Sequence, residues 1–414
     1  MRMRKRTITS NFTESPYFSE ALQVAYYHCV LEMPLKTIAD ILGKSPATIT
    51  RRLDEVRQAG WLRDHPEFTP PPDIWRELQG KMTCTDVEQA LQEHFGDMSI
   101  RRITVLPSPS TTTDDGRNAH SANVERIGLF AAKRLTEALG EGAHVIGTNW
   151  GWSVRHCVSN LRPARANPDL RFVPLVGNLS LDETDPHYEE AIECSSNRLA
   201  QMAATAFGAP RAPRLSTPAY IPRRFHEDLG GLQSIRDFIE SDVSYRRIFG
   251  GKDESGIVQP GLIEQVDTLV TGLSSIDVQT LPIYRPGLIT PEDLPVLEAA
   301  GVVGDLALHL VVDPSEIAAP TEAAVRLVES INDLIVGASP ADFLRVAENS
   351  RAGDSNGLGV IVVAAGTWKS RILSTAIRSG AVNELITDLD TALAIGRHAG
   401  ADLGGRSHLI GGKR

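Results

Sequence analysis

Residues 144–160 read HVIGTNWGWSVRHCVSN and decide the fold of most of the chain. The first part, His144–Gly147, is a short apolar run typical of a buried strand. A glycine-containing turn follows, and Ser153–Asn160 then has the spacing of a helix. A strand that leads through a tight turn into a helix predicts a crossover unit, which joins parallel strands of one sheet.

The same alternation extends in both directions from this stretch. Strands are expected at Ile100–Leu106, Phe172–Val176, Thr268–Thr271, Ala307–Val312, Val360–Ala364 and Glu384–Ile386. Helices are expected at Asn123–Leu139, Asn197–Phe207, Gly231–Glu240, Pro291–Ala299, Pro340–Glu348 and Lys369–Arg378, and loops at Ser108–Asn123 and Arg351–Gly357. This order predicts a large, mainly parallel, Rossmann-like α/β domain, and we find no 20–50-residue repeat that would indicate a solenoid.

Composition excludes several classes of protein. The chain has 414 residues, of which 42% are hydrophobic and 23% charged, as in an ordinary soluble globular protein. It has no apolar run long enough for a membrane span and no apolar core of a signal peptide after its basic start. The four cysteines are far apart, which predicts reduced thiols in a cytoplasmic protein and neither disulfides nor a zinc site.

Charge is divided unevenly along the chain. The net charge of −10 argues against nucleic acid as a partner when it is taken over the whole chain. Residues 1–64, however, contain ten basic and seven acidic residues and carry +3, so the remainder carries −13. A mildly basic N-terminal domain therefore precedes an acidic body.

The N-terminal domain has the pattern of a helix-turn-helix. A helix fits Leu35–Leu42, Gly43 ends it, and Ser45 with Pro46 starts a second helix that runs to about Ala59. A short turn with glycine between two such helices is typical of this DNA-binding motif.

We expect the second of these helices to contact DNA, because polar and basic side chains lie away from its apolar positions. The candidate DNA-binding residues are Lys44, Ser45, Thr48, Thr50, Arg51 and Arg52. The alternative is a small three-helix unit whose arginines are only solvated.

A proline-rich break sets the predicted domain boundaries. Pro66–Pro72 separates an all-α helix-turn-helix domain at 1–65 from a linker helix within 66–98, and residues 99–414 form the effector domain. The linker helix, around Val87–Phe95, is our candidate for transmitting a signal between the two domains.

Several strand-to-helix junctions predict a ligand site. Ligands of open parallel sheets bind at the carboxyl ends of the strands, where glycine turns lead into helices. The candidate effector-binding residues lie at these junctions: Gly147, Thr148, Asn149, Gly151, Ser153, Gly177, Gly272, Asp305, Gly366 and Lys369. Lys369 could clamp a phosphate, or it could be an exposed lysine in the first turn of a helix.

No motif for catalysis accompanies these junctions. The glycine turns lack the signatures of mononucleotide and dinucleotide sites, and the sequence has neither a nucleophile elbow nor a cluster of metal-ligand residues. We therefore expect no catalytic residue, no metal and no cofactor.

In their order along the chain, these motifs resemble the SorC family of bacterial sugar-responsive transcriptional regulators. The resemblance rests on 38–53 (IADILGKSPATITRRL), 150–154 (WGWSV), 267–272, 303–305 (VGD), 364–369 (AAGTWK) and 385–388 (LITD), and it spans about Ala21–His398. It implies a winged or extended helix-turn-helix, and an effector domain similar to ribose-5-phosphate isomerase and glucosamine-6-phosphate deaminase that is retained as a sensor. It also implies an oligomer, commonly a tetramer, on palindromic DNA.

In that family the effector is a sugar, a polyol or a sugar phosphate. The resemblance implies that Gly147, Thr148, Gly151, Ser153, Gly366 and Lys369 hold an effector phosphate. This chain departs from the usual Trp-Gly-Arg-Thr by having Trp152-Ser153 in the last two positions, which leaves an unphosphorylated effector open.

The sequence therefore predicts a cytoplasmic, operator-binding regulator, without enzymatic activity, whose DNA affinity responds to a sugar-like effector. We expect a homo-oligomer, a dimer or a tetramer, and no association with a membrane. The alternative is a sugar-phosphate isomerase or deaminase with the same body fold, since a fold does not determine a function.

Overall fold

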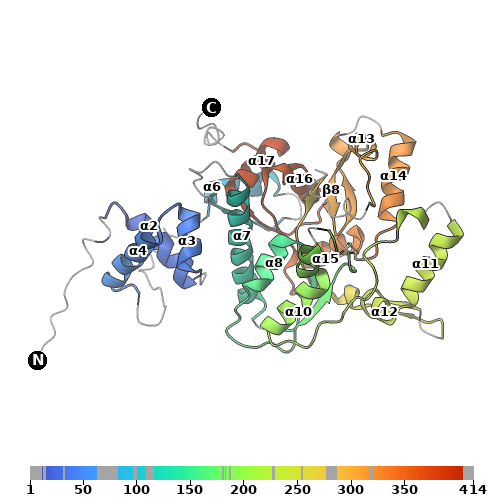
Figure 1. The fold of residues 1–414 in the computed structure, drawn as a ribbon, viewed down its shortest axis with the longest axis horizontal. Coiled ribbons are helices and arrows are strands. Elements are labelled where there is room, and N and C mark those ends of the chain that lie inside the picture. The colour runs from blue at the N-terminus through green and yellow to red at the C-terminus, as the bar shows by residue number, and fades with distance from the viewer. Residues whose placement is uncertain are drawn as a thin grey trace, which may run out of the picture. The chain divides into compact units, whose positions relative to one another are not determined.

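The fold was analysed in a computed structural model of the chain (Figure 1). The structure describes residues 12, 15–30, 33–62, 83–96, 100–108, 116–140, 142–179, 181, 183–185, 188–225, 229–252, 255–276, 287–316 and 320–403. The proline-rich break at Pro66–Pro72 lies outside them.

The chain divides into two compact units. The first contains residues 1–85 and 105–123, and the second contains residues 86–104 and 124–414. The predicted boundaries at 65 and 98 stay a prediction.

The first unit contains the helix-turn-helix. Its elements are α2 (Phe18–Ala25), the short π-helix η1 (Tyr26–Val30), α3 (Leu35–Leu42) and α4 (Pro46–Gln58) (Figure 1). Gly43 ends α3 in the left-handed conformation, with φ of 60°, and the Ser45 hydroxyl caps α4 by accepting the Thr48 amide at 3.2 Å. Both helix boundaries predicted from Gly43 and Ser45 are therefore correct.

Apolar side chains and one buried arginine hold these helices together. Ile38, Ile49 and Val56 are fully buried between α3, α4 and α2. The Arg52 guanidinium, 2% exposed, bonds Glu20 at 2.7 Å and Glu55 at 2.8 Å.

The second unit is built on a six-stranded, mainly parallel sheet, as predicted. Its strand order is β1-β11-β10-β6-β2-β3. The strands are β1 (Arg102–Leu106), β2 (Val145–Thr148), β3 (Arg171–Pro174), β6 (Thr268–Thr271), β10 (Gly359–Val363) and β11 (Glu384–Asp388). The pairs β2·β3, β2·β6, β6·β10 and β10·β11 are all parallel.

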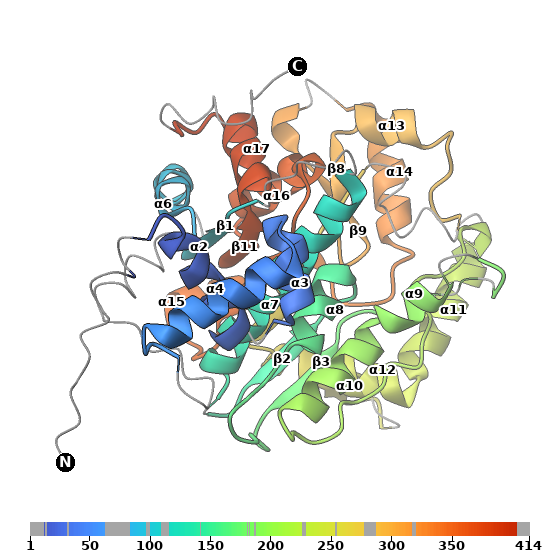
Figure 2. The ribbon, with the colours of Figure 1, turned by 60° about the vertical axis from the view of Figure 1, so that its left-hand side comes forward.

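Helices cover this sheet because the connections between parallel strands must cross over it. α15 packs on β6 and β10. α10 packs on β2 and β3, and α17 packs on β11 (Figure 2). The helices of this part are α6 (Thr85–His94), α7 (Gly116–Ala138), α8 (Trp152–Ser159), α9 (Tyr188–Glu193), α10 (Ser196–Ala206), α11 (Leu229–Ser241), α12 (Val243–Phe249), α13 (Leu294–Ala299), α14 (Glu322–Asn332), α15 (Pro340–Ala352), α16 (Ser370–Arg378) and α17 (Leu389–Ala399). Short 3-10 turns are η2 (Arg223–Phe225), η3 (Leu262–Gln265), η5 (Pro314–Glu316) and η6 (Thr367–Lys369).

A second, antiparallel sheet has the order β7-β8-β9 and was not predicted as a whole. It contains β7 (Ser274–Ser275), β8 (Val302–Leu306) and β9 (His309–Val312). The single strand expected at Ala307–Val312 is wrong at its start, because Ala307 and Leu308 form the turn between β8 and β9.

Two further departures from the predicted pattern concern short segments. β4 (Gly251–Lys252) and β5 (Val258–Gln259) form a separate hairpin that the sequence did not indicate. The loop expected at Ser108–Asn123 is also wrong in its second half, because α7 already begins at Gly116.

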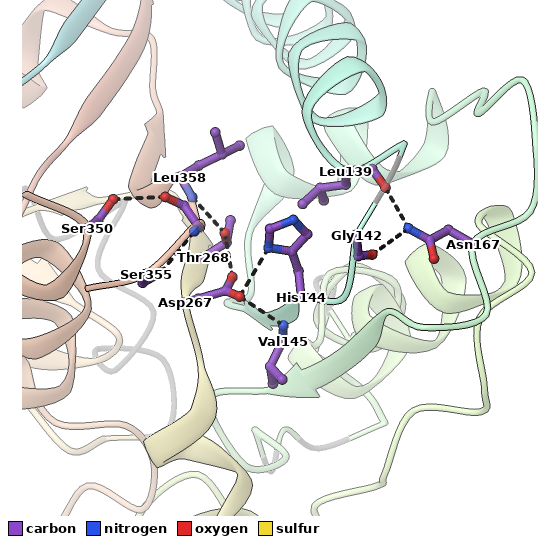
Figure 3. Close-up of polar contacts among 11 residues, drawn as sticks. Leu139, Gly142, His144, Val145, Asn167, Asp267, Thr268, Ser350, Ser355 and Leu358 are labelled. Carbon is purple, nitrogen blue, oxygen red and sulfur yellow. Dashed lines mark hydrogen bonds and ion pairs between the residues drawn. The ribbon is translucent and has the colours of Figure 1, made fainter. Parts of the chain in front are cut away.

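A polar network joins the strands at their amino ends (Figure 3). Asp267, directly before β6, accepts the Val145 amide of β2 at 3.4 Å and faces His144 Nδ1 at 3.1 Å. The next residue, Thr268, accepts the Leu358 amide before β10 at 3.0 Å. These bonds fix where three neighbouring strands begin.

Replacing Asp267 tests this network. Asp267→Ala leaves the Val145 amide and the His144 ring without their acceptor, so we expect a loss of about 1–3 kcal/mol in the free energy of unfolding, measured by urea denaturation. Asp267→Asn keeps one acceptor oxygen and should lose less. Equal losses for the two variants would contradict the assigned role.

Candidate functional site

The carboxyl ends of the parallel strands meet at one edge of the main sheet. Along the chain, β2 leads outward to β3, whereas β6 leads to β10 and β11 on the other side. The chain therefore reverses its direction across the sheet between β2 and β6. Ligands of open α/β sheets bind at such a switch point.

Asn149 bridges this switch point. It directly follows β2, and its Nδ2 donates to Thr271 Oγ1, at the end of β6, at 2.8 Å. The Thr271 hydroxyl donates its one proton to the Gly272 carbonyl at 2.7 Å, so it must accept from Asn149. The amide orientation is thereby fixed, and Asn149 Oδ1 stays buried with no hydrogen-bond partner among the described residues.

Asp305 brings a carboxylate from the second sheet. It is 2% exposed on β8, opposite Ser274 of β7. One carboxylate oxygen accepts the Leu308 amide at 2.9 Å, whereas Oδ1 has no partner within the described part of the chain. Burial raises the pKa of Asp305 to about 6, against the opposing effects of the Leu308 amide, the Ser274 hydroxyl and the Lys369 charge.

The turn that Asp305 supports has a strained backbone. Ala307 and Leu308 have φ of 50° and 72°, in a region that favours glycine, and both are buried. Non-glycine residues keep this conformation only where the surroundings impose it. The bond from the Leu308 amide to Asp305 is one such restraint.

Lys369 lies within electrostatic reach of two carboxylates, Asp305 and Asp388. Burial lowers its pKa to about 8, and the two carboxylates oppose this shift. Asp388 ends β11 and caps α17 by accepting the Thr391 amide at 2.8 Å. Burial raises the pKa of Asp388, and the positive charge of Arg126 acts against this effect.

Hydrogen bonds within the unit already use several backbone amides of the glycine turns. The Asn149 amide donates to the Val270 carbonyl at 3.0 Å, and that of Gly151 donates to Cys194 at 3.1 Å. The Gly366 amide donates to Thr391 Oγ1 at 2.7 Å. These three amides are therefore not available to a ligand in this conformation.

The predicted effector residues fall into two groups. Asn149, Asp305 and Lys369 belong to the polar edge, with Gly272 open beside Thr271 and Ser153 in the first turn of α8. Gly147 and Gly177 lie where the surrounding residues leave no room for a side chain. A Cβ on Gly147 would lie 2.2 Å from Leu269 Cδ2, and one on Gly177 would lie 2.4 Å from the Pro218 carbonyl oxygen.

The remaining predicted positions shape the loops. Thr148 is buried, and its carbonyl accepts the Ser196 hydroxyl at 2.9 Å. Gly151 and Gly366 have φ of 125° and 120°, which turn the chain into α8 and into η6.

Several residues of this edge were not predicted as site residues. Thr271 and Asp388 lie in motifs that carry the family resemblance, but they were not predicted to contact the effector. Trp152 begins α8 after β2, and Trp368 is the second residue of η6 after β10; they are 43% and 40% exposed. Their shared signal in the sequence is a tryptophan after a glycine turn.

In the first unit, the turn before α4 and the first half of α4 expose most of the predicted DNA-binding residues. Lys44, Ser45, Thr50 and Arg51 are exposed, and Thr48 is half-buried beside the Ser45 cap. Lys44 pairs with Glu20 at 3.5 Å.

Arg52 has a different environment from the one expected. Its buried guanidinium lies 3.7 Å from the centre of the Tyr17 ring and holds two carboxylates. These contacts keep it inside the helical unit and stabilise that unit.

The described residues show neither a metal site nor a membrane-spanning helix. They contain no group of three or more histidine, cysteine, aspartate and glutamate side chains that could hold a metal ion. No helix among them has the combined length and apolar character needed to cross a bilayer.

Comparison with known proteins defines the class of this domain. Residues 81–237 match the family model described as "Putative sugar-binding domain". Among curated proteins, none matches the chain.

Solved structures share the fold at low sequence identity. A domain of a possible sugar-binding transcriptional regulator from Arthrobacter aurescens TC1 is 20% identical, with a TM-score of 0.53 over 75% of this chain and 96% of that one. A transcriptional regulator from Streptococcus pneumoniae TIGR4 is 18% identical, with a TM-score of 0.52 over 76% and 97%. The full-length sorbitol operon regulator SorC from Klebsiella pneumoniae is 18% identical, with a TM-score of 0.46 over 92% and 99%.

Residues 81–237 thus match a sugar-binding domain model, and the chain shares its fold with the two regulators from Arthrobacter aurescens and Streptococcus pneumoniae. The sequence resemblance to sugar-binding transcriptional regulators agrees with these matches.

Substitution of Gly177 and Gly272 by alanine tests which of these two glycines is required for packing. Gly177→Ala places a Cβ against backbone atoms of Thr217 and Pro218, so we expect a loss of about 1–3 kcal/mol in stability. Gly272→Ala meets only the Val363 carbonyl oxygen at 3.8 Å and should leave the melting temperature nearly unchanged. Thermal denaturation of both variants gives the comparison, and similar losses would refute the packing role of Gly177.

The buried carboxylate at Asp305 predicts a dependence of stability on pH. Because its pKa is raised from 3.8 to about 6, the folded protein holds a proton that the unfolded chain releases, and stability from this group falls as pH rises through that window. Asp305→Asn removes the cost of the buried charge, so we expect a melting temperature about 5 °C higher at pH 7. The gain should shrink toward pH 4, and a gain independent of pH would rule out this origin.

Proposed function

We propose that this chain is a DNA-binding transcriptional regulator whose affinity for its operator is controlled by a sugar, polyol or sugar-phosphate effector. The effector binds at the carboxyl edge of the main sheet, around Asn149, Asp305 and Lys369. The observation that carries this assignment is the pair of buried oxygens, Asn149 Oδ1 and Asp305 Oδ1, that have no hydrogen-bond partner among the described residues. The fold is also that of the two regulators compared above.

Operator binding is assigned to α4. Its exposed positions combine short polar side chains near its start with Arg51, a combination that suits base edges and phosphates in a major groove. Arg52, with its two carboxylate partners, holds α4 against α2 and is not assigned a contact with DNA.

Regulation requires the effector to bind two states of the protein unequally. A difference of about 1–3 kcal/mol between states of high and low DNA affinity is typical. We propose that the protein acts as a homo-oligomer in the cytoplasm. The two half-sites of a palindromic operator are bound by two recognition helices, one from each of two subunits.

An isomerase or deaminase on the same fold is the weaker candidate. The two solved structures compared above are regulators, and no observation at the edge favours catalysis. Turnover of an aldose or ketose phosphate, without a shift of promoter DNA in a gel, would reverse this preference.

Arg51→Ala tests the role of α4. Removing one phosphate contact should weaken binding to the promoter upstream of the protein's own gene, and it should reduce the slope of log K against log salt by about 1. Fluorescence anisotropy over a salt series measures both. Arg57→Ala is the matched control, because Arg57 is exposed near the far end of α4 and pairs with Asp54. An unchanged slope for Arg51→Ala would exclude this helix from the interface.

A further inference from the structure

We propose that an arginine surface at the amino end of β3 binds the phosphate backbone of double-stranded DNA, in addition to the contact assigned to α4. The arginine surface consists of Arg162, Arg165, Arg171 and Arg211. This inference rests on the proposed function for the presence of DNA. It goes beyond that function because it adds a contact that does not depend on base sequence.

The acidic body contains two segments of opposite charge. Residues 155–181 contain four arginines and one acid, Asp169, and residues 194–226 contain five arginines and neither aspartate nor glutamate. Nine arginines against one aspartate give these segments +8, within a body whose net charge is −13. Clustered positive charge on an otherwise acidic domain is an electrostatic signal for a polyanionic partner.

Two loops carry the arginine surface. The loop between α8 and β3 contains Arg162 and Arg165, and Arg171 is the first residue of β3. Arg211 lies in the loop that follows α10. β3 is an outer strand of the main sheet, and α10 packs on it (Figure 2). Both loops therefore lie at the same border of the sheet.

The two loops are in direct contact. The Asn167 amide of the first loop donates to the Phe207 carbonyl at the end of α10 at 2.7 Å. A Cβ built on Gly208 would lie 2.8 Å from the Ala166 Cβ. Asn167 Nδ2 also donates to two backbone carbonyls after α7, at 3.0 and 2.9 Å (Figure 3). These bonds fix the backbone that carries the arginines.

The side chains of the arginine surface are exposed and have no carboxylate partner among the described residues. Arg162 Nη1 donates to two neighbouring backbone carbonyls at 3.0 and 2.8 Å, and Arg171 Nη1 does the same at 3.0 and 2.9 Å. In both side chains, Nε and Nη2 have no partner within the described part of the chain, and this pair of nitrogens can bind a phosphate in bidentate fashion. By contrast, Arg155 of the same segment pairs with Glu193 at 3.5 Å.

Duplex DNA fits this surface better than a protein or a single strand does. Protein interfaces depend on apolar side chains at their centre, and none of the large exposed hydrophobic side chains of the described residues lies in either loop. Single strands stack on aromatic rings, and the aromatic residue of these loops, Phe207, is fully buried. Contacts to the phosphates of a duplex need positive charge and hydrogen-bond donors, which the arginine surface provides.

Fluorescence anisotropy with the full chain tests the proposal. The probes are two labelled duplexes of equal length, titrated over a salt series. One is taken from the promoter upstream of the protein's own gene, and the other has the same base pairs in scrambled order.

The test variant is Arg165→Ala/Arg211→Ala. Neither side chain has a hydrogen bond among the described residues, so the melting temperature should stay the same. Because two phosphate contacts are lost, we expect both duplexes to bind about tenfold more weakly, with a slope of log K against log salt that is smaller by about 2. The ratio of the two affinities should not change, since these contacts do not read bases.

Arg247→Ala/Arg397→Ala is the matched control. These two arginines are exposed on α12 and α17, and their replacement removes the same charge from other parts of the body. The control should keep the affinity and the slope of the unmodified protein. An equal decrease in the control would show that net charge is responsible, and it would refute the arginine surface.

The outcomes separate this inference from the proposed function. An unchanged slope in Arg165→Ala/Arg211→Ala, together with a reduced slope in Arg51→Ala, would overturn the inference and leave the proposed regulator intact. Failure of the unmodified protein to bind either duplex would contradict the proposed function, and this inference with it. A changed oligomer mass in the double variant at an unchanged slope, measured by sedimentation, would assign the surface to a protein partner and reject its contact with DNA.

Discussion

The parallel pairing of β2 with β6 is the constraint on which the candidate site depends. Its register places Thr148 beside Val270, so that the next residue on each strand, Asn149 and Thr271, meets its counterpart at the carboxyl edge. At the opposite end, Asp267 ties the start of β6 to the start of β2. Because both ends are fixed, the hydrogen bond between Asn149 and Thr271 follows from the register of the two strands and does not depend on the conformation of a loop.

The second sheet adds a carboxylate to this edge. Asn149, Thr271 and Asp388 follow or end strands of the main sheet, and the pairing of β7 with β8 adds Asp305. This placement costs stability in two ways: the carboxylate is buried, and the turn after it holds Ala307 and Leu308 at positive φ. Such costs persist at functional sites and are compensated elsewhere in the structure.

Periodicity in the sequence was enough to predict the main architecture, because each strand of the parallel sheet is a short apolar run bounded by turns. It was not enough for β8, whose Val-Val-Gly-Asp-Leu sequence interrupts the apolar run with a glycine and an aspartate.

The reason why a position requires glycine could not be predicted from the sequence either. Gly147 and Gly177 follow the pattern of ligand-binding turns, yet their restriction comes from Leu269 and Pro218, far away in the sequence. Similarly, nothing near Arg52 in the sequence indicates that Glu20, 32 residues earlier, holds it in the core.

The free-energy cost of the two buried oxygens is similar to the coupling energy that is typical of allosteric regulation. Each unpartnered acceptor, Asn149 Oδ1 and Asp305 Oδ1, carries a penalty of about 1–3 kcal/mol when it is buried without a donor. The coupling between an effector and a DNA site is typically of the same size. A ligand that satisfies these oxygens therefore shifts the balance between two states of the protein, provided that only one state presents both oxygens at the edge.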